Sequence, residues 1–295
     1  MSNVSLKIGD VAIQRLEEVY GPAFPAAMFL PSWDPGIREE LGPDTVNRHI
    51  EDETDLALAS VHTWVIRTPQ KTVLVDTCNG NHKERAIEDM AMLETDWLDR
   101  LAAAGVQPGD VDAVICTHLH LDHVGWNTTL DGAEWVPTFP NATYYFNQAE
   151  FEFWDPREGD FTGKEVNTNV FEDSVLPVFD RDLVELWSGD GITVDDSLRL
   201  ELAAGHTPGH AIGWIESQGE RGLLSGDSMH SAIQVYRPEW SSGFCVDPKM
   251  SAATRRTILE RCVESNAILL PAHFSAPHAY RVEEQGDSFA VVDAV

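Results

Sequence analysis

The stretch THLHLDHVGW (117–126) places three imidazoles and a carboxylate within six positions, at His118, His120, Asp122 and His123. Imidazole nitrogens and carboxylate oxygens are ligand atoms for zinc and related divalent metals. In extended backbone, alternate side chains point to the same side, so His118, His120 and Asp122 would share one side while His123 turns away. This density of ligand-type side chains predicts a metal site rather than a set of unrelated buried histidines.

Three more ligand-type side chains follow apolar runs later in the chain. His206 stands in GHTPGH, Asp227 in LLSGDSMH and His273 in LLPAHFSAP. The run VDAVICT, which precedes the histidine cluster, is also apolar and is predicted to be a buried strand. Because strand ends that lie side by side in a sheet bring their loops together, we expect all four loops to meet at one sheet edge.

Seven nitrogen and oxygen ligands are too many for one tetrahedral ion and suit two. One ion is predicted to bind three imidazoles, those of His118, His120 and His206. The other is predicted to bind Asp122, His123 and His273, with the two oxygens of Asp227 bridging the pair. Two Zn²⁺ are expected because the set contains no thiolate, and iron, manganese or cobalt are the alternatives.

The chain is strongly acidic, with 49 Asp and Glu against 20 Lys and Arg and a net charge of −29 over 295 residues. That charge repels polyphosphate and anionic lipid, so neither a nucleic-acid nor a membrane partner is expected. The N-terminal MSNVSLKIGD lacks the pattern of a signal peptide, and no apolar run reaches membrane-spanning length. Four widely spaced cysteines without a C-x-x-C pair fit a reducing compartment, so a cytoplasmic protein is expected.

A hydrophobic content of 43% and the absence of a Gly/Ser-rich or Pro-rich linker predict one domain over 1–295. An N-terminal hairpin and then an irregular aromatic loop (from residue 21) are predicted over 1–36, and an inserted helical segment over 149–190. Helical patterns are predicted at 83–104 and 248–265. Further strands are predicted at 61–68, 71–77, 111–117, 142–148, 198–204, 211–217, 222–227 and 267–273, the last of these ending the series.

The order of these motifs resembles that of the metallo-β-lactamase fold superfamily. H-x-H-x-D-H (118–123), GHTPGH, GD (226–227) and PAH (271–273) follow one another as in that family, and the match runs from about Asp76 to His273. The resemblance implies an α+β fold, an αββα sandwich of two mixed sheets with outer helices and the metal site at one sheet edge. It also implies that Asp76, in TVLVDT, supports the metal loops without binding metal directly.

Within the superfamily, the lactonase and methyl-parathion-hydrolase branch fits best. Class B β-lactamases often have a cysteine ligand where this chain has Asp227, and tRNA-processing nucleases need a basic surface. Glyoxalase-II-like enzymes and flavodiiron proteins typically carry further domains that this sequence does not match. Acyl-homoserine-lactone lactonases typically have a tyrosine three residues after the bridging aspartate, where this chain has His230. His230 is expected to be a general acid, a substrate contact or a supporting residue.

The resemblance implies a dinuclear zinc hydrolase in which a hydroxide shared by two metals opens a lactone or cleaves an activated ester. Asp227 would hold the metal pair and orient the nucleophile, and His230, or Asp122 through a water, would protonate the leaving oxygen. The expected substrate is a small neutral ester or lactone. Its expected contacts are aromatic side chains, those of Phe24, Phe29, Trp33 and Trp64.

The sequence leaves other functions open, and it also leaves open whether the protein forms a homodimer. Organophosphate or aryl-ester hydrolysis would use the same site. A β-lactamase and a mononuclear iron oxygenase are less favoured, and an inactive scaffold is not expected because all seven ligands are present. The apolar 1–36 segment would offer a homodimer seam, as in related lactonases. The acyl group, the ring size, the native metal and the role of the acidic excess are not specified by the sequence.

Overall fold

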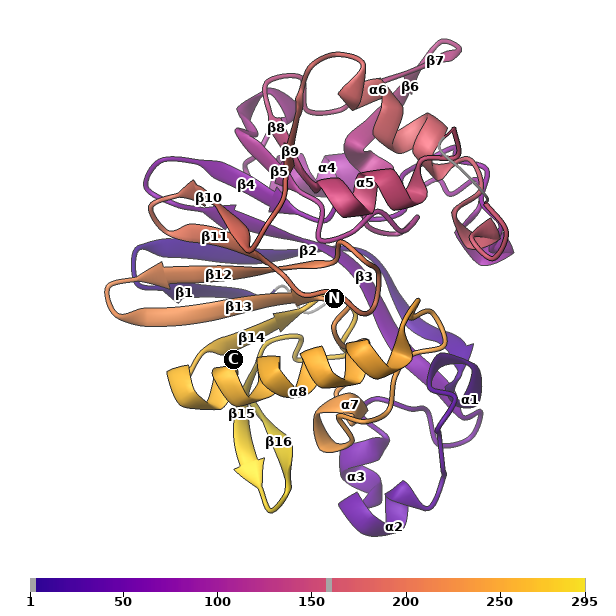
Figure 1. Cartoon of the computed structure of the whole chain (residues 1–295), viewed down its shortest axis with the longest axis vertical. Coiled ribbons are helices and arrows are strands. Elements are labelled where there is room, and N and C mark those ends of the chain that lie inside the picture. Colours follow the sequence, from indigo (N-terminus) through magenta and orange to yellow (C-terminus); the bar gives the residue numbers. More distant parts are fainter. Residues whose placement is uncertain (1–3, 158–160, 295) are drawn as a thin grey trace.

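The computed structural model describes residues 4–157 and 161–294, which form two seven-stranded sheets packed face to face (Figure 1). The strands of the first sheet, in spatial order, are β1 (Ser5–Ile8), β2 (Val11–Pro25), β3 (Leu56–Arg67), β4 (Thr72–Val75), β5 (Ala113–Ile115), β8 (Thr143–Asn147) and β9 (Val184–Trp187). Those of the second are β10 (Gly191–Asp195), β11 (Leu198–Leu202), β12 (Ala211–Ser217), β13 (Glu220–Gly226), β14 (Ile268–Pro271), β15 (Tyr280–Gln285) and β16 (Ser288–Asp293). A separate ribbon pairs β6 (Thr128–Asp131) with β7 (Glu134–Pro137).

Helices cover the outer face of each sheet (Figure 1). The first sheet is covered by α4 (Trp97–Ala103), α5 (Gln148–Trp154) and α6 (Leu176–Phe179), and the second by α8 (Pro248–Ser265). Shorter helices are α1 (Ala26–Phe29), α2 (Ile37–Leu41), α3 (Pro43–Val46) and α7 (Ile233–Tyr236). Among helices in the described ranges, none is long and apolar enough to cross a membrane. The expected αββα sandwich of α+β class is confirmed.

Alternation along the strands separates an inter-sheet core from an outer core under the helices. In β4, Val73 and Val75 pack between the sheets, whereas Leu74 packs outward. In β8, Tyr145 faces inward and Tyr144 outward. Successive side chains of a strand point to opposite faces, so each central strand is apolar at every position when both faces are covered. This explains why the strand before the histidine cluster is a nearly continuous apolar run.

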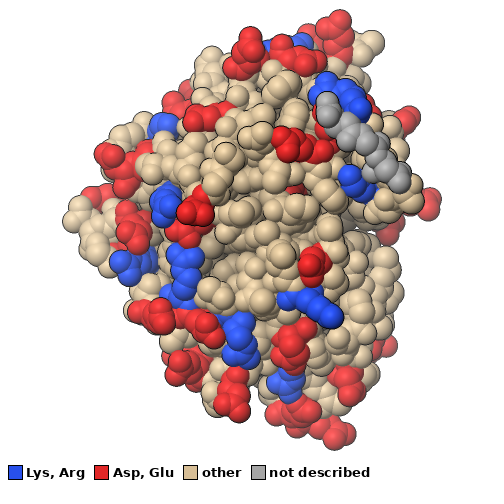
Figure 2. Space-filling model, viewed as in Figure 1, with Lys and Arg blue, Asp and Glu red and all other residues tan. Residues whose placement is uncertain are grey.

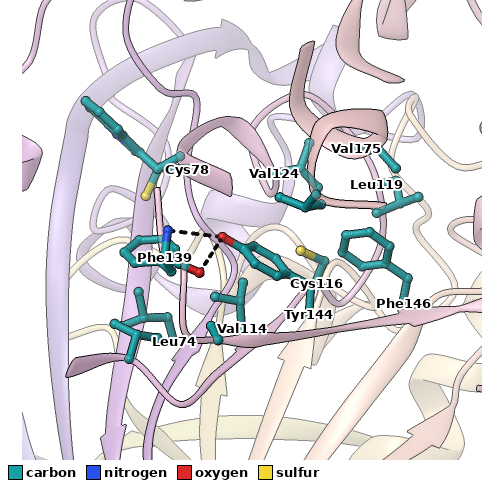
Figure 3. Close-up of a cluster of buried hydrophobic side chains, with 14 of the residues drawn as sticks. Leu74, Cys78, Val114, Cys116, Leu119, Val124, Phe139, Tyr144, Phe146 and Val175 are labelled. Atoms are coloured by element: carbon teal, nitrogen blue, oxygen red, sulfur yellow. Dashed lines mark hydrogen bonds between the residues drawn. The ribbon is translucent and has the colours of Figure 1, made fainter. Parts of the chain in front are cut away.

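The outer core of the first sheet contains the buried hydroxyl group of Tyr144. Figure 3 shows Tyr144 among apolar side chains that include Leu74 and Phe146, with its hydroxyl beside the main chain of Phe139. The hydroxyl accepts the Phe139 N–H at 3.2 Å and donates to the Asn127 carbonyl at 3.1 Å. Because Asn127 lies just after the histidine cluster in the chain, these bonds anchor the loop that carries the cluster.

Near the N-terminus the structure corrects the predicted irregular loop. The hairpin of β1 and β2 is present, but β2 continues through Gly21 to Pro25 and pairs with β3 as far as Leu56. The register shifts between Pro22 and Pro25, and such a bulge tolerates proline, which cannot donate a ladder hydrogen bond. Residues 1–3 of the predicted 1–36 segment lie outside the described ranges.

The predicted helix over 83–104 is wrong for most of its length, because only Trp97–Ala103 is α-helical. Met92 adopts a φ of +50°, which is incompatible with a continuing helix. The Asn81 side chain accepts the Thr95 N–H at 2.8 Å and fixes a loop in place of helical turns. By contrast, the helix predicted at 248–265 coincides with α8.

The strand count was also underestimated. The predicted 149–190 insert contains α5, a π-helical turn (Phe171–Val175) and α6, but it ends in β9; its residues 158–160 lie outside the described ranges. The strand β10 was not predicted, and β15 and β16 follow the strand that was expected to be the last. Strand β15 reads YRVEEQ and exposes its last three residues, so its apolar alternation is too short to predict a strand.

Candidate metal centre

The loops that carry the predicted ligands all leave the ends of central strands. The histidine cluster follows β5 in the first sheet, and His206 follows β11 in the second. Asp227 follows β13, and His273 follows β14, which pairs with β13 in parallel. The structure therefore brings all seven predicted ligands to one edge of the sandwich, where they form two groups.

The first group consists of three buried imidazoles. His118 Nε2 lies 2.9 Å from His120 Nδ1, and His206 Nε2 lies 3.2 Å from His118 Nε2 and 3.0 Å from His120 Nδ1. Nitrogens bound to one tetrahedral zinc at about 2.0–2.1 Å stand roughly 3.3 Å apart by geometry. The three nitrogens therefore have nearly the spacing that a shared metal ion requires.

The second group consists of His123, His273 and Asp122. The Nε2 atoms of His123 and His273 lie 3.1 Å apart. The two oxygens of Asp122 lie 3.7 Å from His123 Nε2 and 3.6 Å from His273 Nε2. The opposite ring nitrogens have partners of their own: Asp76 Oδ2 is 2.9 Å from His123 Nδ1, and the Ser60 carbonyl is 2.8 Å from His273 Nδ1. Such partners favour the tautomer that presents Nε2 to a metal.

Asp227 lies between the two groups and is buried. Its Oδ2 is 3.4 Å from both His206 Nε2 and His123 Nε2, and its Oδ1 is 3.0 Å from His273 Nε2. Its backbone N–H donates to His210 Nε2 at 2.9 Å, while His210 Nδ1 lies 3.2 Å from the Ala203 carbonyl. His210 therefore helps to orient the one carboxylate that faces both groups.

Asp76 contacts the loop of the histidine cluster from behind. Its Oδ1 accepts the Thr117 N–H at 2.8 Å, and its carboxylate also accepts the Thr117 hydroxyl. Asp76 has a φ of +57°, an uncommon conformation for a residue other than glycine. The strained residue joins the end of β4 to the loop that follows β5.

The electrostatics of the centre fit bound divalent cations. Burial lowers the pKa of His120 to about 4 and those of His118 and His206 well below their ordinary value, so these rings are neutral. Burial also opposes charge on His123 and His273, but the surrounding carboxylates, Asp227 foremost, together outweigh it and raise both pKa values. The neutral imidazoles of the first group and the carboxylates beside the second are donor types that zinc accepts, and an ion at the second group would displace the protons of His123 and His273.

A cavity of about 770 Å³ opens over the two groups. Asp122, Asp227, His120, His230 and His273 line the end of the cavity at the metal centre, and most of the remaining lining is apolar. Among the described lining residues there is no lysine or arginine. The cavity is large enough for a small organic substrate of about drug size and is suited to an uncharged one.

Two of the four aromatic residues predicted to contact substrate line this cavity, namely Phe24 and Phe29. The other two predictions are corrected. Trp64 occupies an inward position of β3, packs between the sheets and donates its indole N–H to the Pro271 carbonyl at 3.1 Å. Trp33 donates to Asp55 at 2.9 Å and packs outside the cavity. Tyr20, Trp154 and Phe244 supply the other aromatic lining.

His230 lies in the cavity wall beside the centre. Its Nε2 is 3.2 Å from Asp227 Oδ2, and its ring meets Phe29 edge-on at 5.6 Å between centroids. Its Nδ1 has no hydrogen-bond partner in the described part of the chain, although the ring is buried. Burial lowers the pKa of His230, so the ring is neutral and holds a single N–H.

Two buried glutamates that hold the metal loops were missed by the sequence analysis. Glu150, on α5, accepts the Leu119 N–H at 3.1 Å and the Gly209 N–H at 2.9 Å, so it joins the histidine cluster to the GHTPGH loop. Glu18, on β2, accepts the Asn79 N–H at 2.8 Å and the Trp126 indole N–H at 2.7 Å. Both stand in stretches with no motif, and the sequence carries no signal of their burial.

The glycine of GHTPGH at position 209 is required by this close contact. A Cβ at Gly209 would lie 2.4 Å from the backbone nitrogen of Glu150, which is far inside van der Waals contact. The loop that carries His206 can therefore approach α5 only with glycine at this position.

The stretch of chain that carries the candidate ligands matches a known protein family. The family model described as the Metallo-beta-lactamase superfamily matches residues 57–273. The chain belongs to the metallo-beta-lactamase superfamily. The predicted family is thereby confirmed, and the predicted enzyme class, a metal-dependent hydrolase, agrees with it.

Several curated relatives share part of their length with this chain. An N-acyl homoserine lactonase of Bacillus thuringiensis is 25% identical over 223 residues, which cover 71% of this chain and 79% of the relative. The probable metallo-hydrolase YybB of Bacillus subtilis (strain 168) is 27% identical over 189 residues, covering 64% and 71%. The lactonase AttM of Agrobacterium fabrum (strain C58 / ATCC 33970) is 26% identical over 171 residues, and the match spans only 59% of its length.

Two solved structures resemble the whole chain. AidC, described as a dizinc quorum-quenching lactonase in complex with a product, has a TM-score of 0.82 at 19% identity. A hydrolase described as AbOPH, in the beta lactamase superfamily, has a TM-score of 0.81 at 24% identity. Each match covers 99% of this chain and 97% of the other, and the two likenesses confirm the fold.

The contact of Glu150 with two metal loops yields a first prediction. Glu150→Gln replaces one acceptor oxygen by an N–H₂ group that faces backbone donors, so it should lower the free energy of unfolding by about 1–3 kcal/mol. It should also weaken zinc binding, because both loops lose their common anchor. Urea unfolding and zinc titration measure the two effects. Glu152→Gln, on the exposed side of the same helix, is the control, and equal behaviour of the two variants would refute the role.

Proposed function

We propose that this protein is a dinuclear metal-dependent hydrolase that opens a lactone or cleaves an activated ester. The observation that carries the proposal is the position of Asp227, which faces both ligand groups at the end of an apolar cavity. Zinc is the proposed metal because the donors are imidazole and carboxylate, with iron, manganese or cobalt as alternatives. The names of the curated lactonases support the ester or lactone bond as the target.

The proposed ligands follow the two observed groups. His118, His120 and His206 would hold one ion, and Asp122, His123 and His273 the other, with Asp227 shared between them. A divalent pair of this kind acidifies water and polarises a carbonyl oxygen. The role of the protein is to fix the ligand positions and to keep the imidazoles neutral, which burial accomplishes for the first group.

Two acid–base groups are available at the reacting centre. Asp227, as a buried carboxylate, can accept a hydrogen bond from the attacking water and orient it toward the substrate. His230 faces the same position and is the proposed donor of a proton to the leaving oxygen: its ring is neutral at rest, so it would first receive the proton of the attacking water through Asp227 Oδ2, which lies 3.2 Å from His230 Nε2, and then pass a proton on. Asp122, acting through a water, is the alternative donor.

The charge of the site supports an uncharged substrate. Apart from the histidines of the centre, the described cavity lining has no basic side chain, and it carries Asp89, Asp122 and Asp227, so an anionic group away from the proposed metal ions would meet no cationic partner. The face of the molecule in Figure 2 likewise shows many acidic side chains and fewer basic ones, as the net charge of −29 requires. A β-lactam carries a carboxylate that this lining does not match, which favours a neutral lactone or ester.

Aryl-ester or organophosphate triester hydrolysis is the second candidate, and a cluster of aromatic rings favours it. Phe24 and Phe244 meet edge-on at 5.4 Å between centroids, and Phe29 meets His230 at 5.6 Å. Flat rings beside the proposed proton donor would suit an aromatic leaving group, since aromatic pairs prefer such offset and edge-on contacts.

A substrate panel tests the proposal and separates the two candidates. The zinc-loaded protein is assayed with neutral lactones, aryl esters, paraoxon and a cephalosporin, and its metal content is measured by elemental analysis. We expect two metals per chain and turnover of neutral lactones above that of the other classes. Turnover of paraoxon without lactone opening would favour the second candidate, and one iron per chain with oxygen consumption would contradict both.

Substitution of the shared carboxylate should disable the centre. Asp227→Ala should remove one of the two metals and nearly all turnover, because neither group then has the carboxylate that joins it to the other. Elemental analysis and steady-state kinetics measure these losses. Asp89→Ala, which removes another carboxylate of the cavity lining, should keep both metals. A variant at Asp227 with two metals and a full rate would show that the assignment is wrong.

The proposed proton donor should affect turnover and not metal content. His230→Phe keeps a ring of similar size in the cavity wall but removes the N–H, so kcat should fall by about 10²-fold or more. The fall should shrink for substrates with better leaving groups, since these need less protonation. His82→Phe, at an exposed histidine, is the control. An unchanged kcat for His230→Phe would exclude this histidine from the mechanism.

A further inference from the structure

The residues just before α8 line the cavity and also hold the His206 loop through backbone hydrogen bonds. Phe244, Cys245 and Val246 line the cavity. The Val246 N–H donates to the His206 carbonyl at 2.8 Å, and the next N–H donates to the Gly205 carbonyl at 3.0 Å. A Cβ at Gly205 would lie 2.4 Å from the backbone nitrogen of Ser251, so the His206 loop lies directly against the start of α8.

The Cys245 thiol lies behind the His206 imidazole. Its Sγ is 3.5 Å from His206 Nδ1 and 3.3 Å from Ser251 Oγ. Because His206 Nε2 points at the other two imidazoles of its group, the ring proton belongs on Nδ1 when that group binds a metal. The Nδ1–H can then donate to the sulfur, and the thiol S–H can donate to the Ser251 hydroxyl oxygen.

The chain of contacts continues to the second metal loop. Ser251 Oγ accepts from Arg255 Nη2 at 3.1 Å, and Ser251 and Arg255 are one turn apart on α8 and both buried. Arg255 Nε donates to the Ser228 carbonyl at 2.7 Å, in the residue that follows Asp227. One face of α8 therefore connects the loop of His206 with the loop of Asp227.

We propose that Cys245 is a positioning residue of the metal centre, whose thiol orients the His206 imidazole and is itself held by Ser251 and Arg255. The proposal rests on the metal centre of the proposed function. The other cysteines, at 78, 116 and 262, lie in apolar cores, whereas Cys245 joins a ligand ring to the cavity wall. The same cavity receives His230, whose buried Nδ1 has no partner in the described residues, so the thiol borders a site built for a ligand.

Two substitutions of Cys245 distinguish orientation from packing. Cys245→Val keeps the apolar wall but removes the hydrogen-bonding group, and Cys245→Ser keeps a donor and an acceptor. If the thiol orients His206, the valine variant should bind one of its two zinc ions about 10–100-fold more weakly, and the serine variant should stay close to wild type. If Cys245 only packs in the wall, the serine variant should bind zinc more weakly than the valine variant, because valine suits an apolar wall better than serine.

The measurement is equilibrium competition for zinc against a chromophoric chelator, with the visible spectrum of the Co²⁺-substituted protein as a second readout of ligand geometry. Cys262→Val, a buried cysteine of α8 away from the ligands, is the control. Should Cys245→Val fail to fold, Ser251→Ala removes the acceptor of the thiol and should weaken the same zinc site. If Cys245→Val or Ser251→Ala binds zinc with wild-type affinity, the proposed role of Cys245 is wrong, but the proposed function is unaffected. A wild-type protein that binds no zinc overturns the proposed function as well.

Discussion

The close approach of buried imidazoles and carboxylates at one sheet edge is the constraint on which the rest of the structure depends. Five histidine rings surround Asp227, which is almost wholly removed from water. A buried carboxylate is costly unless charges or hydrogen bonds compensate it; His123 and His273, whose pKa values are raised by the nearby carboxylates, provide part of that compensation, whereas the rings of the first group are neutral. Divalent cations between the ligand groups would supply the remainder, so the folded protein is expected to gain stability when it is loaded.

The surrounding elements hold these side chains close together, although the repulsion between like charges and the loss of hydration make such an arrangement unfavourable. Asp76 orients His123, the Ser60 carbonyl orients His273, and His210 orients Asp227. Glu150 ties two metal loops to α5. These partners come from both sheets and from the outer helices, so the centre is assembled only when the whole sandwich has formed. Such outer partners usually matter to metal affinity nearly as much as the ligands themselves.

That the seven candidate ligands would meet at one sheet edge was predictable because their types are distinctive and each follows an apolar strand. The central strands were predictable for the same reason, since burial of both faces leaves a continuous apolar run. Glu150 and Glu18 were not predictable, because a buried glutamate has no local pattern that separates it from a solvated one. Trp64 was misplaced because a one-residue difference along a strand decides whether a side chain faces the core or the cavity. Peripheral strands such as β15, which is next to the edge strand β16, were missed because they bury too few residues.

The apolar lining and the metal centre would act on different parts of a substrate. Away from the centre, the described lining has no lysine or arginine and is mostly apolar, so it favours the neutral part of a substrate. Hydrolysis of an ester or lactone produces a carboxylate, which the proposed divalent ions would attract at the metal end of the cavity. The metal centre would therefore bind the reacting ester group, and the apolar lining would select the rest of the substrate.

The most direct test of the account is a crystal structure of the zinc-loaded protein with anomalous diffraction recorded on both sides of the zinc absorption edge. The account predicts two zinc peaks, one beside His118, His120 and His206 and the other beside Asp122, His123 and His273, with the Asp227 carboxylate between them. A single peak, or two peaks with Asp227 bound to neither, would contradict the shared-carboxylate centre on which the proposed function rests.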